Sequence, residues 1–74
     1  MGVGATFSTN GGLTERELEV LQLLSEGYSN KQVSEKLFIS VQTVKTHVAH
    51  IFEKLGSRDR AHAVATAMRR GLLS

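Results

Sequence analysis

Several residue types are missing from this chain of 74 residues, and each absence narrows what it can do. It has no cysteine, which excludes disulfide bonds, thiolate metal ligands and a cysteine nucleophile. No stretch approaches the ~20 consecutive apolar residues that a membrane-spanning helix needs. Residues 1–12 contain no lysine, arginine or apolar run, so they do not form a signal peptide. We therefore expect a cytoplasmic location.

The length is enough for one small domain and no more. So small a core rarely supports both a fold and a deep catalytic pocket, so we do not expect an enzyme. Four of the seven glycines lie in residues 1–12, a composition typical of a flexible lead or linker. The domain is expected to span residues 13–74. The absence of proline, with 41% hydrophobic residues, favours an all-α domain.

Helix caps divide the domain into four predicted helices. Thr14 with Glu17, and Ser29 with Gln32, form capping boxes, in which each side chain bonds the other residue's backbone. Four residues are predicted N-caps: Thr14, Ser29, Ser40 and Asp59. The corresponding helices are expected to end near Glu26, near Leu37, at Leu55 and before Gly71. This pattern predicts a compact four-helix domain, in which the acids of residues 15–19 are ordinary first-turn residues that favour the helix dipole.

Apolar spacing predicts which side of each helix is buried. On the third helix one stripe occupies an arc of roughly 100°. It consists of Val41, Val44, Val48, Ile51, Phe52 and Leu55. On the last helix we expect the buried side to consist of Ala61, Val64, Ala65, Ala67 and Met68. Ala63 and Thr66 would then lie on an exposed face, and small residues there allow close approach of a second copy. We predict dimer contacts at Ala63, Thr66 and Arg70.

Only Phe38, Ile39 and Ser40 separate the second helix from the third. So short a connection prevents two helices from lying side by side, so they should cross steeply as a helix-turn-helix. The second helix of such a motif enters the major groove of DNA. Its polar face carries the candidate base contacts Gln42, Lys45, Thr46 and Ala49. Lysine can reach guanine, glutamine can reach adenine, and threonine or alanine can contact a thymine methyl group.

Charge is distributed unevenly, although the net charge is only +2. Residues 13–27 carry four glutamates and one arginine, whereas residues 28–60 carry six basic and three acidic side chains. The basic segment contains the helix-turn-helix, as phosphate binding requires. Helix N-termini also offer backbone N–H groups to phosphate. The candidate phosphate contacts are Ser29, Asn30, Lys31, Ser40, Val41, Thr43, His50, Lys54 and Arg58.

Histidines do not make a convincing metal or catalytic site. His47 and His50 share a helix at a spacing of three, but no cysteine supplies a third ligand and His62 lies on another helix. Serine and histidine positions are already explained by helix caps and helix faces. We expect no metal and no cofactor.

Four ordered segments carry a family resemblance: residues 13–17 (LTERE), 27–33 (GYSNKQV), 39–48 (ISVQTVKTHV) and 54–61 (KLGSRDRA), the last followed by Ala63 and Val64. They resemble the C-terminal DNA-binding domain of the LuxR/NarL family of bacterial transcription regulators, which includes effector domains of two-component response regulators. The resemblance implies base contacts at Lys45, Thr46 and Ala49. Many family members carry lysine or another polar residue where this chain has Ala49, so a hydrogen bond to a base is not expected there.

The resemblance also implies a homodimer on inverted or direct DNA repeats, with contacts through the last helix. It implies a regulatory domain before Leu13, although stand-alone regulators exist in the family, and it leaves RNA polymerase open as a further partner. Two alternatives stay open. One is region 4 of a sigma factor, which begins similarly and also carries a helix-turn-helix. The other is a helical protein-interaction module that does not bind DNA.

Overall fold

The computed structural model describes residues 11–73. The expected flexible lead therefore lies almost entirely outside the described residues, while Gly11 and Gly12 form a turn. Four helices follow, which are α1 (Glu15–Ser25), α2 (Asn30–Leu37), α3 (Val41–Leu55) and α4 (Arg60–Arg69). The described part of the chain contains no strand. The prediction of an all-α, four-helix fold is confirmed.

Side-chain caps begin the helices where the sequence predicts them. Thr14 and Ser29 form complete capping boxes, and the Ser40 and Asp59 side chains each accept from the third N–H of their helix. The third helix also ends where the sequence predicts, since Gly56 caps α3 with a left-handed φ of 66°. None of the described helices is long and apolar enough to cross a membrane.

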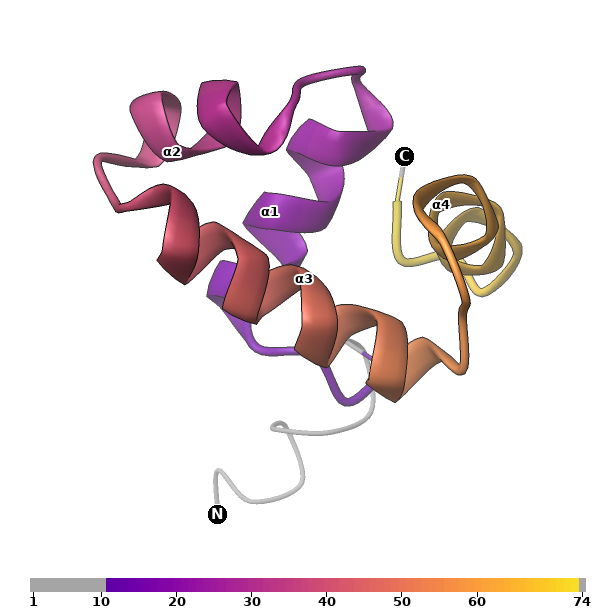
Figure 1. Ribbon diagram of the computed structural model, residues 1–74. Helices are drawn as coiled ribbons and strands as arrows, with labels where there is room; N and C mark the ends of the chain where they lie inside the picture. The colour runs from indigo at the N-terminus through magenta and orange to yellow at the C-terminus, as the bar shows by residue number, and fades with distance from the viewer. Residues whose placement is uncertain (1–10, 74) are drawn as a thin grey trace, which may run out of the picture.

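Helices α1 and α3 form the centre of the fold, because each contacts the other three helices. Figure 1 shows α1 behind α3, with α2 and α3 diverging from a short turn and α4 on the opposite side. Ten buried apolar residues fill the space between the helices. They are Leu13, Val20, Leu21, Leu24, Val33, Val44, Ile51, Leu55, Ala63 and Ala67. The core holds α3 from behind and leaves its opposite face exposed.

The turn between α2 and α3 contains an unusual backbone conformation. Phe38 ends α2 with a left-handed φ of 58°, and its side chain is 93% exposed. Glycine or asparagine is the usual residue in this conformation, because a Cβ atom crowds the backbone there. Ser34 stabilises the turn, since its carbonyl oxygen accepts hydrogen bonds from the Phe38 and Ile39 N–H groups.

One expectation for α3 is wrong at a single position. Val44, Ile51 and Leu55 are buried as expected, but Val41 is 36% exposed. Val41 is the first residue of α3, and the packing of this helix against its neighbours begins one turn later, at Val44. From Val44 onward the rest of the stripe packs on the core, with Val48 and Phe52 half-buried.

The orientation expected for α4 is wrong at Ala61, Ala65 and Met68, although Ala67 is buried as expected. Ala63, Thr66 and Ala67 are buried, whereas Ala61, Ala65 and Met68 are exposed. The helix contains four alanines, which are small enough to pack on any side, so apolar spacing does not determine its rotation. The Thr66 hydroxyl is buried, and within residues 11–73 it has no hydrogen-bond partner.

Candidate nucleic-acid interface

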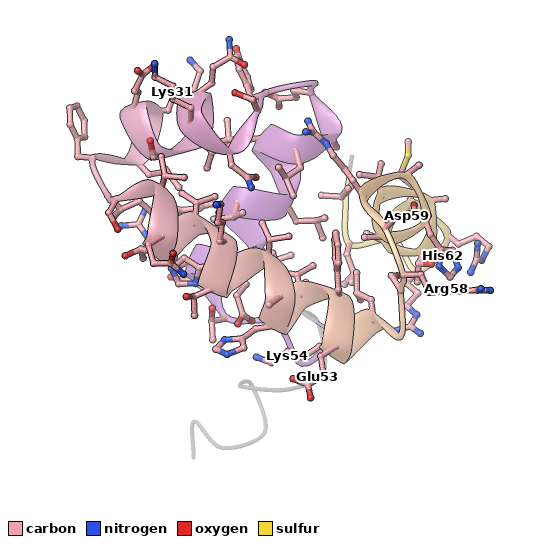
Figure 2. The ribbon with its side chains drawn as sticks, in the orientation of Figure 1. Lys31, Glu53, Lys54, Arg58, Asp59 and His62 are labelled. Carbon is pink, nitrogen blue, oxygen red and sulfur yellow. The ribbon has the colours of Figure 1, made fainter. Side chains whose placement is uncertain are left out.

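The exposed face of α3 carries all four predicted base contacts. Gln42, Lys45, Thr46 and Ala49 are all exposed, on the side opposite the buried residues of the helix. The first turn of α3 contains no acid, and its one acid, Glu53, lies near the other end. Figure 2 shows Glu53 and Lys54 at the end of α3 that is far from the turn after α2. A phosphate backbone could therefore approach the first half of α3 without meeting a carboxylate of this helix.

Two serines shape the N-termini of α2 and α3. Ser40 Oγ accepts from the Thr43 N–H at 3.0 Å and lies 2.8 Å from Thr43 Oγ1. Ser29 Oγ accepts from the Gln32 N–H at 3.2 Å. Because each serine bonds the third N–H of its helix, the first N–H groups stay available at the helix end. Both helices can therefore present backbone donors to phosphate.

Four of the predicted phosphate contacts line one cleft. Ser29, Asn30 and Lys31 line it from the start of α2, and Arg58 lines it from the loop before α4. Lys31 and Arg58 lie well apart in Figure 2, on different walls of this cleft. Asp59 also lines the cleft, but its carboxylate accepts the His62 N–H at 2.9 Å as the cap of α4.

Two other predicted phosphate contacts face a carboxylate inside the domain. Lys54 Nζ donates to Glu17 Oε1 at 2.8 Å, and His50 Nδ1 lies 3.8 Å from Glu17 Oε2. The Glu17 side chain is only 4% exposed, so the expectation of an ordinary first-turn acid is wrong for Glu17. Since Glu17 is on α1 and Lys54 is on α3, their ion pair connects the end of α3 to the start of α1. A phosphate contact by Lys54 or His50 stays a prediction.

Glu17 is ionised at neutral pH for reasons that the geometry explains. Burial raises the pKa of its carboxyl more than any other single cause. The hydrogen bonds from Lys54 and from the Thr14 N–H, together with the charges of Lys54 and His50, outweigh burial and hold the pKa below the ordinary value of 4.5.

Arg60 is a further anchor that the sequence did not reveal. Its Nη2 donates to the Leu24 carbonyl at 2.8 Å and to the Tyr28 carbonyl at 2.5 Å. The Leu24 carbonyl lies in the last turn of α1, where a positive charge is favourable, and the Tyr28 carbonyl lies in the loop before α2. The anchor fixes the loop that carries Arg58. No sequence pattern indicates it, because Arg60 lies more than thirty residues from both partners.

Glu17 did carry a signal in the sequence. It lies three and four residues before Val20 and Leu21, both fully buried, so all three side chains share one face of α1. An acid on the apolar side of a helix needs a partner, because burying an unpaired charge is costly.

The predicted dimer contacts do not form one exposed patch. Ala63 is 0% and Thr66 is 2% exposed, so their packing against the domain leaves them unable to contact a second copy. Arg70 is exposed and caps α4, and its part in a dimer stays a prediction. The accessible side of α4 instead presents Ala61, Ala65 and Met68. Together with Val64 and residues of α1, they line a shallow apolar groove.

Within residues 11–73, no three histidine or carboxylate side chains lie close enough together to hold a metal ion.

In this fold a short turn joins two helices, and two further helices support them from behind. The second helix of the pair presents a polar face without an acid in its first half. These features define a DNA-binding helix-turn-helix protein. The chain belongs to the luxR family of bacterial regulatory proteins, which residues 12–67 match. This finding confirms the LuxR-type resemblance. The domain is a DNA-binding domain of transcription regulators and not an enzyme.

Individual relatives agree with this assignment. The chain is 48% identical over 61 residues to the oxygen regulatory protein NreC of Staphylococcus aureus, covering 82% of this chain and 28% of NreC. It is 49% identical, with a TM-score of 0.80, to the response regulator ChrA of a heme-sensing two-component system, covering 82% of this chain and 30% of ChrA. It is 44% identical, with a TM-score of 0.79, to the transcription factor GerE, covering 84% of this chain and 92% of GerE. The chain therefore spans less than a third of NreC and ChrA but nearly all of GerE.

Proposed function

We propose that this domain binds specific double-stranded DNA sequences by placing the first half of α3 in the major groove. Gln42, Lys45, Thr46 and Ala49 contact bases. The starts of α2 and α3, together with Arg58, contact phosphates. The observation that carries the proposal is the exposed polar face in the first half of α3, which contains no acid and lies opposite a buried apolar face.

Salt dependence tests binding itself. A selection from random oligonucleotides supplies the site, and fluorescence anisotropy then measures Kd over a range of salt concentrations. Release of counterions from phosphates should make log K fall steeply with log salt. A flat dependence, or no binding at low salt, would contradict the proposal and favour a protein-interaction module.

Lys45→Ala tests the placement of α3. It should weaken binding to the selected site by about 1–3 kcal/mol and relax the preference at one base position. Lys36→Ala is the matched control, because Lys36 Nζ lies on α2, 4.5 Å from the centre of the Tyr28 ring. An equal loss for both variants on every sequence would show that Lys45 contributes only general charge.

We also propose that two copies bind together through the exposed side of α4. Its support is the apolar groove lined by Ala61, Val64, Ala65 and Met68, the last of which is 57% exposed. A single domain of this size offers a limited contact area, and a second copy raises affinity through effective concentration.

Ala65→Glu tests this dimer. A carboxylate in the apolar groove should leave binding to one half-site unchanged and remove the advantage of DNA with two half-sites. His62→Glu is the control, because His62 is exposed on α4 and does not line the groove. If Ala65→Glu still binds two half-sites cooperatively, this side of α4 is not the dimer contact.

Finally, we propose that the domain is the effector part of a longer response regulator. The support is its similarity to NreC and ChrA, of which it spans 28% and 30%. An immunoblot of source cells with an antibody against the domain should detect a protein well above 8.1 kDa. A band at 8.1 kDa alone would instead indicate a single-domain regulator like GerE.

A further inference from the structure

The Thr46 hydroxyl on the exposed face of α3 already has a hydrogen-bond partner. Thr46 Oγ1 donates to the backbone carbonyl of Gln42 at 3.1 Å. A hydroxyl has only one hydrogen to donate, so this bond uses its donor. Threonine adopts staggered rotamers, and the bond fixes one of them. The methyl group of Thr46 is thereby held in a defined direction.

Ala49 adds a second methyl group to the same face. Thr46 and Ala49 are both exposed and are three residues apart, which places their Cβ atoms about 5–6 Å from each other. The other hydroxyl at the start of α3 is engaged as well, since Thr43 Oγ1 lies 2.8 Å from Ser40 Oγ. The middle of the candidate reading face is therefore apolar, with Gln42 and Lys45 beside it as polar groups.

The major groove offers one apolar group to such a surface, the C5-methyl group of thymine. Successive bases are about 3.4 Å apart along the helix axis, a spacing that two methyl groups about 5–6 Å apart can follow. We infer that Thr46 and Ala49 recognise the methyl groups of two thymines at neighbouring base pairs, and that the Thr46 hydroxyl serves only to orient its own methyl group. This inference rests on the proposed placement of α3 in the major groove.

Discrimination between thymine and the other bases follows from the burial of apolar surface. At either position a base without a C5-methyl group leaves the methyl groups of Thr46 and Ala49 without the apolar contact that thymine supplies, so less apolar surface is buried. Gln42 and Lys45 then supply the hydrogen bonds at the flanking bases. The selected site should therefore contain two neighbouring base pairs with thymine next to the position that Lys45 reads.

Replacement of thymine by deoxyuridine is the direct test, because it removes the methyl group and keeps every hydrogen-bonding group of the base. Each selected site is synthesised with one dT→dU change at a time, and Kd is measured by fluorescence anisotropy. Loss of one buried methyl group should weaken binding about fourfold. Two neighbouring positions should show this loss, and thymines elsewhere should not.

Two variants of Thr46 separate its methyl group from its hydroxyl. Thr46→Val keeps the methyl group and should bind the dT site as the wild type does. Thr46→Ser keeps the hydroxyl and should lose about fourfold against dT, with no further loss when the matching base becomes dU. Ala49→Gly should abolish the dU effect at the other position, and circular dichroism checks that this variant is folded.

The outcomes distinguish this inference from the proposed function. If dU binds as well as dT at every position while the salt dependence stays steep, methyl recognition is wrong and DNA binding stands. If Thr46→Val loses more affinity than Thr46→Ser, the hydroxyl contacts a base and the inference is overturned. If the wild type shows neither sequence preference nor salt dependence, the proposed function fails, and methyl recognition fails with it.

Discussion

Removing the charge of Glu17 should destabilise the domain in a manner that depends on pH. Glu17→Gln is the informative change, because glutamine at this position still completes the capping box with Thr14. What it removes is the carboxylate that accepts from Lys54 at 2.8 Å and lies 3.8 Å from His50.

The magnitude follows from the surroundings of the pair. A hydrogen bond to a charged group contributes about 1.5–3 kcal/mol, whereas a neutral one contributes about 0.5–1.5 kcal/mol. The Lys54 side chain is 36% exposed, so water can solvate its ammonium after the change, which limits the loss. We expect the free energy of unfolding to fall by about 1–2 kcal/mol at pH 7. Each kcal/mol lowers the Tm of a domain of this size by about 4–8 °C.

The pH dependence has a definite sign. The pKa of Glu17 is lower in the folded state than its ordinary value of 4.5, so the unfolded chain takes up the proton more readily. The stabilisation is complete well above pH 4.5 and is lost as the pH falls through the lowered pKa of the folded state. The stability difference between wild type and Glu17→Gln should therefore be largest near pH 7 and shrink progressively below pH 4.5.

Urea unfolding followed by circular dichroism measures this difference at several pH values. Glu19→Gln is the matched control, because Glu19 is on the same helix but pairs with Arg16 at 3.1 Å on the exposed surface. Such a pair contributes about 0–1 kcal/mol. The reasoning is refuted if Glu17→Gln is as stable as Glu19→Gln at pH 7, or if its deficit is unchanged in acid.

Three further changes test separate features of the fold. Thr66→Val should be neutral or raise the free energy of unfolding by up to about 1 kcal/mol, because it replaces a buried hydroxyl that lacks a partner within residues 11–73; a loss above about 1 kcal/mol in urea unfolding would contradict this. Phe38→Asn should raise the Tm, since asparagine adopts the left-handed conformation at φ 58° more readily; an unchanged or lower melting temperature would show that the phenyl ring stabilises the turn. Lys54→Ala should lower the free energy of unfolding by about 1–3 kcal/mol, because it leaves the Glu17 carboxylate without its main partner. It should also weaken binding to all DNA sequences alike, and a loss of affinity confined to one sequence would instead assign Lys54 to a base contact.

The sequence by itself determined the helices and the exposed polar face of α3. Helix caps depend only on residues close together in the chain. Each capping side chain accepts a hydrogen bond from a backbone N–H group three residues away, as at Thr14, Ser29, Ser40 and Asp59. The exposed polar face of α3 was likewise readable, since the apolar residues of this helix repeat with the helical period.

Tertiary structure decided what depends on residues far apart in the chain. The rotation of α4 follows from its packing against the core, because an alanine-rich helix has no distinct apolar side of its own. Lys54, which pairs with Glu17, and the two carbonyl partners of Arg60 lie more than thirty residues away, and only the folded chain brings them together. The same packing decides that Ala63 and Thr66 belong to the core, while Ala61, Ala65 and Met68 remain exposed.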